Sequence, residues 1–567
     1  MAKALLWLIA VFTNLAFFQR LASSAVTPQE SHLGPWIIGI PVLGALVIGL
    51  MARYGSEKIR GHGIPEALEA ILLGRSLINP KVAVLKPISS AVSIGTGGPF
   101  GAEGPIIMTG GAFGSLFAQL FHLTASERKT LLVAGAAAGM TAVFATPIAA
   151  VLLAVELLLF EWRPRSFIPV AVAAMVAALA REPLLGAGPI FVVPPHGLLS
   201  AGTIGMAAVI GLAAGLASGG LTFLVYACED RFEKLPLHWM WWPALGAVAI
   251  GVGGWLDPRV LGVGYEFIHG LLRGELTGLP AITLLLAKGL VWAIALGSGT
   301  SGGVLAPLLM IGGALGVVCG QAFGIADAGL WATVGMAAMM GGTMRSPLTG
   351  LVFLLELTHD TNALPALLVS TVAALCVTVL LLPRSILTEK LARRGQHIAR
   401  DYSVDVLELR RVGEVMDRNP PRIPAETPLA EVSDRVARSD DPLSRRQAIL
   451  VEDADGALAG IVTRGDLLRA QSADRHRPIL AIATRQLIVS HPDETLRDAL
   501  ESMLRHDIGR LPVVDRAQPG RILGYLGRAD ILAARAGHHE EEHRRERGPL
   551  GQRLLSRPRP PAPSASS

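Results

Sequence analysis

Long apolar stretches follow one another up to about Pro383, and charged residues are dense only beyond that point. A helix that crosses a membrane needs about 20 apolar residues, and several of the stretches are shorter. Short or broken helices occur at membrane depth only where protein or a water-filled cavity covers their free backbone. The pattern therefore predicts a mainly α membrane domain that contains broken helices. The stretches lie near residues 4–19, 35–52, 106–120, 129–160, 167–181, 203–227, 241–255, 279–296, 304–324, 329–341, 347–357 and 364–383.

Composition divides the chain in the same way. Of the 567 residues, 51% are hydrophobic and 17% are charged, whereas about a quarter of the residues in soluble chains are charged. We expect a membrane domain over residues 1–395, a linker over 396–410 and a soluble domain after it. Basic residues crowd the boundary, so the soluble domain is expected to be cytoplasmic and the protein to be a multi-pass protein of a bacterial inner membrane, in contact with lipid. The net charge of +5 is small and dispersed, so nucleic acid is not an expected partner.

Two stretches 202 residues apart repeat one pattern. Lys86 precedes Gly-Ala-Glu-Gly-Pro at residues 101–105, and Lys288 precedes Gly-Val-Leu-Ala-Pro at residues 303–307. Each stretch is followed by a proline and, nine residues after the proline, by a glutamate. Internal repeats with broken apolar segments in matching places are typical of transport proteins whose site lies where the repeats meet.

Three segments rich in glycine and proline are predicted to begin helices at membrane depth. They are residues 61–66 (Gly-His-Gly-Ile-Pro-Glu), 101–105 and 303–307. Proline is tolerated in a first helical turn, and glycine lets the backbone approach an ion closely. A helix start offers unpaired N–H groups and the positive end of the helix dipole. Together the segments predict an anion site built from backbone.

These segments resemble the three signature segments of the CLC family of chloride channels and proton-coupled chloride exchangers. The resemblance covers the membrane domain to about Arg394. It implies an inverted-repeat helical bundle with broken helices. It also implies a homodimer in which each subunit has its own pore for chloride or a similar small anion.

The resemblance assigns roles to single residues. Glu103 matches the glutamate that gates the pore by competing with the anion. The backbone N–H groups of Val304 and Leu305 fall where the family binds the central anion. Lys86 and Lys288 would supply positive potential along the pore, or would extend to the membrane surface. The expected anion-binding residues are Gly61, His62, Gly63, Ile64, Pro65, Gly101, Gly104, Val304, Leu305 and Leu387.

Three positions depart from the family's pattern. His62 stands where many members have an anion-binding serine, Leu387 where many have a pore tyrosine, and Leu157 where exchangers carry an internal glutamate that loads protons. Because Leu157 cannot carry a proton, we expect channel-like or weakly proton-coupled transport. A proton-coupled exchanger that uses another proton path is the alternative, with Glu156 as a candidate for that path. The simpler role for Glu156, as for its repeat partner Glu356, is hydrogen bonding at a helix end.

His62 allows two interpretations. It is either a titratable anion ligand in the pore or a neutral cap of its helix. In the first case anion binding takes up a proton, so binding tightens as pH falls.

The soluble domain contains two similar units, expected at residues 411–472 and 473–537. Each has an amphipathic helix, short β runs and a Gly-x-x-x-Arg-x-Asp segment. The β-α-β-β-α order resembles a tandem pair of CBS domains, which gives the soluble part an α/β fold. Residues 538–567 are rich in His, Glu and Arg and then in Pro and Ser, so a disordered tail is predicted.

The resemblance to CBS domains also suggests a ligand. Thr463, Asp466 and Asp530 match residues that bind adenine nucleotide in some CBS pairs, and pure scaffolding is the alternative. No other cofactor and no metal is expected.

Other function classes fit the sequence less well. A CBS-regulated cation channel would require several carboxylates at membrane depth, and the apolar part of this chain has few. An enzyme would require a metal-ligand or nucleophile pattern, and the sequence shows neither. The cysteines lie in apolar surroundings and are interpreted as small hydrophobic residues. The first apolar stretch resembles a secretory signal, but a first membrane helix is the favoured interpretation.

Overall fold

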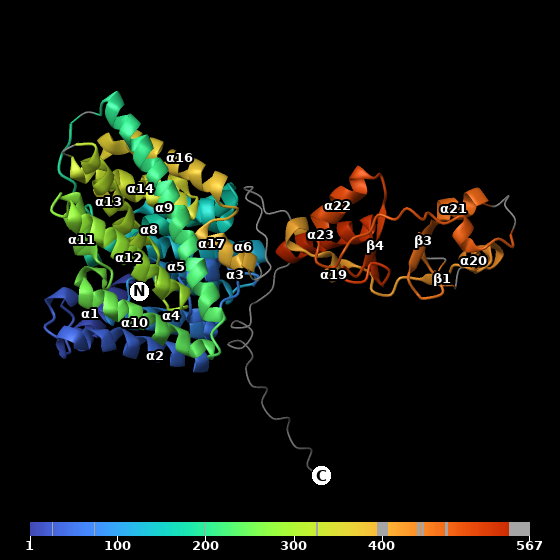
Figure 1. Cartoon of the computed structure of the whole chain (residues 1–567), viewed down its shortest axis with the longest axis horizontal. Coiled ribbons are helices and arrows are strands. Elements are labelled where there is room, and N and C mark those ends of the chain that lie inside the picture. The colour runs from blue at the N-terminus through green and yellow to red at the C-terminus, as the bar shows by residue number, and fades with distance from the viewer. Residues whose placement is uncertain are drawn as a thin grey trace, which may run out of the picture. The chain divides into compact units, whose positions relative to one another are not determined.

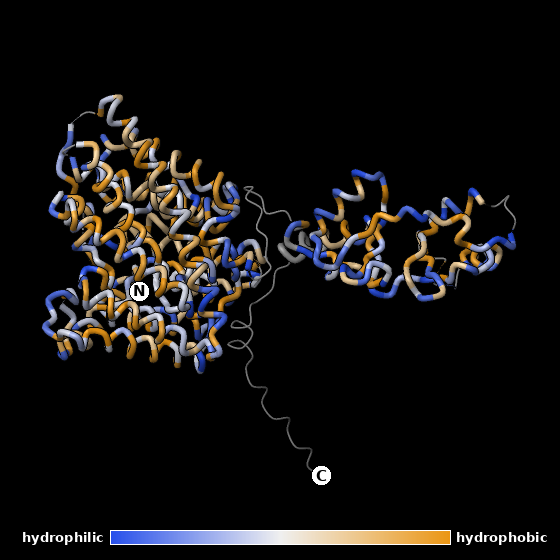
Figure 2. Tube along the Cα trace, viewed as in Figure 1, coloured by the Kyte–Doolittle hydropathy of each residue, from blue (hydrophilic) through white to orange (hydrophobic). Residues whose placement is uncertain are grey.

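The computed structural model describes the whole chain except residues 25, 73, 187, 198, 325–326, 394–405, 439–440, 442, 444–446, 471–474 and 544–567. The chain divides after Arg394 into two compact units, a helical one and one that mixes helices with strands (Figure 1). Hydrophobic residues run along the helices of the first unit, and hydrophilic residues are frequent in the second (Figure 2). The predicted order of a helical membrane domain and a polar α/β domain is confirmed.

The first unit is built from two consecutive sets of helices in matching order. Six helical segments among the described residues are long and apolar enough to cross a membrane, whereas α3 has nine residues and α11 has eight. The first set is α1 (Ala2–Phe18), α2 (Gly39–Tyr54), α3 (Ile64–Leu72), α4 (Pro80–Gly95), α5 (Glu103–Ala118), α6 (Ala125–Phe144), α7 (Pro147–Leu153) with a π-helical turn (Ala154–Leu159), and α8 (Pro164–Leu185). The second is α9 (Ala201–Glu233), α10 (Trp242–Leu256), α11 (Tyr265–Leu272), α12 (Leu279–Gly297), α13 (Leu305–Ala322), α14 (Ala328–Met344), α15 (Pro347–Thr358), α16 (Leu364–Leu381) and α17 (Ile386–Arg393).

Glycine allows the closest helix pairs in both sets. α5 packs on α6 and α13 packs on α14. A Cβ atom on Gly110 would collide with the carbonyl oxygen of Gly135, and one on Gly312 would lie 2.6 Å from that of Gly335. Small residues let membrane helices approach until their backbones touch. The repeat seen in the sequence therefore extends to the packing of the core.

The second unit contains two small α/β modules with separate apolar cores. In the first, β1 pairs in parallel with β2, and β2 pairs antiparallel with β3. In the second, β4 pairs antiparallel with β5, and a single parallel bridge from Ser490 to Val513 stands beside them. The elements are α18 (Val406–Leu409), α19 (Val412–Val415), β1 (Arg422–Pro424), α20 (Leu429–Ala437), β2 (Ala448–Glu452), β3 (Leu458–Thr463), α21 (Arg464–Arg469), α22 (Leu496–Arg505), β4 (Arg510–Val514), β5 (Ile522–Gly527) and α23 (Arg528–His543).

The helices differ from the predicted boundaries at two places in the second unit. α18 lies inside the segment predicted to be a linker, 396–410. α23 continues to His543, so a helix covers the first six residues of the segment predicted to be a disordered tail. The rest of that segment, residues 544–567, lies outside the described residues.

Candidate functional site at three helix starts

The starts of α3, α5 and α13 meet inside the first unit. The backbone N–H of Gly61 donates to the carbonyl of Thr300 at 3.2 Å. Gly101 and Gly303 exchange backbone hydrogen bonds at 3.2 and 2.9 Å. A Cβ atom on Gly104 would collide with the carbonyl oxygen of His62. The three Gly/Pro segments singled out in the sequence are thus joined by their own backbone, which only glycine permits at this spacing.

Glu103 occupies the start of α13. The residue is fully buried at the first position of α5. Its Oε1 accepts a hydrogen bond of 2.5 Å from the backbone N–H of Ala306, and its Oε2 has no hydrogen-bond partner among the described residues. A carboxylate therefore takes the position that a free anion would take at a helix N-terminus. Val304 and Leu305, which were predicted to offer their N–H groups, are buried immediately before Ala306. The N–H of Ala306 itself was not predicted to take part.

The start of α3 differs from the prediction. The N–H of Gly63, expected to face an anion, donates instead to Oε2 of Glu66 at 2.7 Å. Oε1 of Glu66 pairs with Nζ of Lys390 at 2.8 Å, which ties α17 to α3. A glutamate three residues into a helix commonly reaches back to the N-terminus in this way. That spacing was present in the sequence as a sign of capping.

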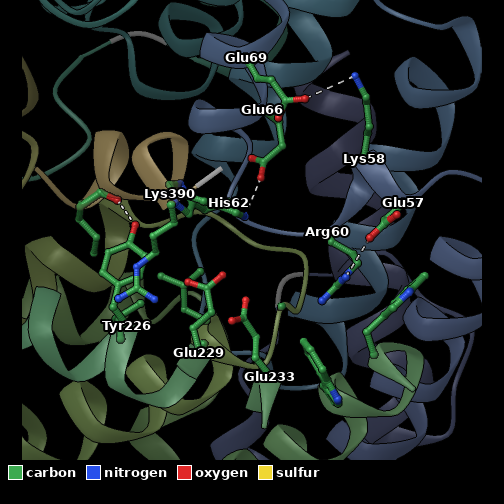
Figure 3. A pocket seen from close by; sticks show the side chains of 18 residues that line it. Glu57, Lys58, Arg60, His62, Glu66, Glu69, Tyr226, Glu229, Glu233 and Lys390 are labelled. Carbon is green, nitrogen blue, oxygen red and sulfur yellow. Dashed lines mark hydrogen bonds and ion pairs between the residues drawn. The ribbon is translucent and has the colours of Figure 1, made fainter. Parts of the chain in front are cut away.

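His62 lies directly before the start of α3 and lines a cavity of about 780 Å³. The side chain is only 3% exposed, and its Nδ1 has no hydrogen-bond partner among the described residues. Figure 3 shows Lys390 and Glu66 beside His62, with Glu229 and Glu233 across the cavity. Glu66 already accepts the hydrogen bond from the Gly63 N–H at the start of α3, and both interpretations of His62 stay predictions. The residues that line the cavity are Glu57, Lys58, Arg60, His62, Glu66, Glu69, Val225, Tyr226, Glu229, Glu233, Trp239, Trp242, Leu296, Gly297, Gly299, Ile386, Lys390 and Arg393.

Lys86 and Lys288 each donate hydrogen bonds to backbone carbonyl groups at corresponding places in the two sets of helices. Both are fully buried, so neither extends to the membrane surface. Nζ of Lys86 donates to two carbonyl oxygens at 2.8 and 2.7 Å, and to Oγ of Ser301 at 3.1 Å. Nζ of Lys288 donates to two carbonyl oxygens, both at 2.9 Å. Each ammonium group thus holds the chain that leads into a Gly-x-Gly turn. The carbonyl groups belong to Ile59, Gly61, Val260 and Gly262.

Glu156 and Glu356 cap each other's helices across the repeat. Glu156 accepts hydrogen bonds from the N–H groups of Leu348 and Thr349 at the start of α15, at 3.3 and 2.8 Å, and from the Thr349 hydroxyl at 2.6 Å. Glu356 accepts from the two corresponding N–H groups of α7, at 2.9 and 2.8 Å. A carboxylate at a helix start satisfies unpaired donors and the helix dipole. The helix-end role weighed for both residues is the one the geometry supports.

The two leucines that depart from the pattern of polar pore residues are both buried. Leu157 lies in the π-helical turn after α7, and Leu387 lies in the first turn of α17. The hydroxyl of Tyr226 donates to the carbonyl of Ile386 at 2.5 Å, so a tyrosine from α9 fixes the start of α17. Leu387 can contribute only its backbone and its apolar surface to an anion path.

In the second unit the predicted nucleotide residues cap helices. The Asp466 carboxylate accepts from the N–H and hydroxyl of Thr463 at 2.8 and 2.7 Å, and from Arg469. Asp530 accepts from the N–H of Gly527 at 2.8 Å. Burial alone would raise the pKa of Asp466, but its hydrogen bonds to Thr463 and Arg469 hold the pKa below the usual value. Scaffolding accounts for these contacts, and nucleotide binding stays a prediction.

Comparison with known proteins identifies the architecture. A family profile described as voltage gated chloride channel matches residues 43–379. The chain belongs to this family, the CLC family. A CBS domain profile matches residues 412–473 and 479–537. The resemblance inferred from the three Gly/Pro segments is thus confirmed.

Relatives and solved structures agree with this assignment. The chain is 28% identical over 569 residues to the chloride channel protein CLC-f of Arabidopsis thaliana, covering 85% of this chain and 71% of that protein. It is 28% identical over 378 residues to the H(+)/Cl(-) exchange transporter ClcA of Klebsiella pneumoniae, and the match covers 63% of this chain and 78% of that protein. The fold matches a slow cyanobacterial Cl-/H+ antiporter with a TM-score of 0.62 at 22% identity, over 69% of this chain and 93% of that one. It matches a eukaryotic CLC transporter with a TM-score of 0.60 at 19% identity, and the match covers 93% of this chain and 94% of that one.

Membership of the CLC family makes this chain a multi-pass membrane protein that transports anions. Its structure brings together the predicted residues at the three helix starts. It adds Ala306, Glu66 and Lys390, which were not among the predicted site residues.

Proposed function

We propose that each subunit conducts chloride or a similar small anion through the junction of α3, α5 and α13, with Glu103 as the gate. The observation that carries the proposal is the hydrogen bond from the Ala306 N–H to the Glu103 carboxylate. A buried charge needs such a partner, and an incoming anion needs the same N–H. Carboxylate and anion therefore compete, and the path opens when Glu103 is protonated or displaced.

The transport is channel-like or weakly coupled to protons. Leu157 is buried and has no titratable group. The neighbouring Glu156 is engaged with two N–H groups and a hydroxyl of α15, so releasing it to carry protons would leave that helix start unpaired. Leu157 therefore cannot carry a proton, and Glu156 could do so only by giving up the hydrogen bonds that stabilise the start of α15.

A proton-coupled exchanger is the second candidate. The ClcA relatives bear the name of exchange transporters. In this chain a buried His62 with an unpartnered Nδ1 lines the cavity next to Glu66. These two groups offer a titratable route toward the helix starts that does not pass through position 157.

Flux measurements separate the two candidates. Purified full-length protein is reconstituted in liposomes, and chloride efflux and external pH are recorded together. We expect chloride to move without stoichiometric proton movement, and a chloride gradient to fail to drive protons uphill. Proton pumping at a fixed ratio to chloride would contradict the channel-like mechanism. Its loss in His62→Ser, with retention in Glu156→Gln, would assign the route to His62.

A homodimer is part of the same proposal. Leucine, isoleucine, valine and methionine side chains stand exposed at helical spacing along α8, where Ile168, Val172, Met175 and Leu179 are 55–68% exposed. An apolar stripe of this kind fits a second copy of the chain or lipid. Cross-linking in native membranes, with Val172→Trp as the disrupting variant, distinguishes the two.

Adenine nucleotide is proposed as a regulatory ligand of the CBS pair, on the basis of Asp466 and Asp530. Calorimetry with ATP, ADP and AMP on the full-length protein tests this. Heat that disappears in Asp530→Ala supports binding, and no heat with any nucleotide leaves the pair as a scaffold.

A further inference from the structure

The start of α11 is the repeat partner of the start of α3. Gly262 and Gly264 lie 201 residues after the two glycines that lead into α3, and all four have positive φ. The first residue of α11 is Tyr265, whereas α3 begins with Ile64. Figure 1 shows α3 beside α17 and α11 on the opposite side of the first unit. This second Gly-x-Gly helix start contributes no residue to the lining of the cavity.

The hydroxyl of Tyr265, at the start of α11, is a hydrogen-bond donor without an acceptor among the described residues. The ring of Tyr265 packs against Phe191 with 6.1 Å between ring centroids. Its hydroxyl oxygen is buried and has no hydrogen-bond partner among the described residues. α11 packs on α13, and a Cβ atom on Gly264 would collide with the side chain of Met310. Burying a hydroxyl without a partner costs free energy, so this position requires an explanation.

Glu103 provides the matching acceptor. Its Oε2 is also buried without a partner, and the Tyr265 hydroxyl is close enough to interact electrostatically with this carboxylate. Three other titratable groups lie near this face. Lys288 is held by two carbonyl groups, and Glu266 is exposed. His269 packs its ring on Phe191 at 5.0 Å, and its Nδ1 has no hydrogen-bond partner among the described residues.

We propose that Tyr265 is a positioning residue for the open gate: when an anion takes the Ala306 N–H, the Glu103 carboxyl turns away from the cavity and receives a hydrogen bond from the Tyr265 hydroxyl. This inference rests on the proposed gating role of Glu103. The hydroxyl lowers the free energy of the displaced carboxyl group and leaves the route from the cavity to the start of α13 open. Two buried polar atoms that lack partners in the closed arrangement then satisfy each other.

A double-mutant cycle tests the pairing. Chloride efflux at pH 7 is measured from liposomes that contain wild type, Tyr265→Phe, Glu103→Ala or the double variant. Because a hydrogen bond to a carboxyl group is lost, we expect Tyr265→Phe to lower efflux about three- to tenfold and to raise the chloride concentration for half-maximal flux. In the Glu103→Ala background the same substitution should change efflux by less than about twofold, since no carboxyl group remains to be held. Tyr54→Phe, at a tyrosine that is 80% exposed, is the matched control.

The outcomes separate this inference from the gate itself. If Glu103→Ala raises efflux while Tyr265→Phe changes nothing, the pairing is wrong and the gate stands. An equal loss from Tyr265→Phe in both backgrounds would place the hydroxyl on the anion path or in the fold, and would also overturn the pairing. If Glu103→Ala leaves efflux unchanged, the gate and the pairing fail together.

Discussion

The two sets of helices in the membrane unit share a scaffold and differ in chemistry. Lys86 and Lys288 hold corresponding carbonyl groups, and Glu156 and Glu356 cap corresponding helices. Where the repeat breaks, the first set has Glu103 and the second has an apolar residue in register with it. Positions that match between the sets hold the fold, and positions that differ carry the function.

The largest expected effect comes from the paired lysines. Lys86→Met and Lys288→Met each remove two hydrogen bonds to buried carbonyl groups. A carbonyl group left without a donor costs about 1–3 kcal/mol, and the Gly61 carbonyl keeps a long bond of 3.4 Å from the N–H of Gly302. We expect both variants to lose several kcal/mol of stability, measured as thermal unfolding in detergent. Lys81→Met, on the exposed side of α4, should change stability by less than about 0.5 kcal/mol. A stable Lys288→Met beside an unfolded Lys86→Met would break the equivalence of the two sets.

The crossed glutamates should show a smaller and equal effect. Glu156→Ala and Glu356→Ala each remove the cap of a helix start, which costs about 1–2 kcal/mol. We expect the two unfolding temperatures to fall by similar amounts and chloride flux per folded molecule to stay unchanged. A specific loss of proton movement in Glu156→Ala, with no such loss in Glu356→Ala, would show that Glu156 is more than a cap.

His62 sharpens the comparison, because its counterpart in the second set is Val263. If His62 binds the anion, chloride affinity should rise from pH 8 to pH 5.5, since binding favours the charged ring. The gain in binding free energy should be on the order of 1 kcal/mol for each unit by which the anion raises the pKa of His62. Calorimetry on the Glu103→Gln background, with and without His62→Ser, measures it. A pH dependence that is absent, or that survives His62→Ser, would rule out a ligand role.

The sequence predicts those parts of the fold that depend on local pattern. Apolar stretches located the long helices, and the Gly/Pro segments located the starts of α3, α5 and α13. α4 was missed because it carries Lys86, Pro87 and several buried serines, so hydropathy does not mark it. α11 and α17 were missed because each has eight residues, about two helical turns, which is too short for periodicity to detect.

The site was predicted in its backbone and only partly in its side chains. The motif at residues 101–105 identified Glu103, but its partner was Ala306 rather than Val304 or Leu305. The ion pair between Glu66 and Lys390 joins residues 324 positions apart, and no local pattern reports such a contact. Contacts formed in the folded chain pair some of the helix-start N–H groups, as Glu66 pairs that of Gly63. The N–H groups that remain unpaired determine which helix start can bind an anion.

The central claim is that the Glu103 carboxylate closes the path by occupying the start of α13. Chloride efflux from liposomes that contain Glu103→Gln, measured between pH 5.5 and 8 beside wild type, tests it most directly. The exposed Glu275→Gln serves as the control. Removing a charged hydrogen-bond acceptor that blocks the path should raise efflux about tenfold or more at neutral pH and should abolish its rise with acidity. Unchanged efflux with an unchanged pH response would contradict the account.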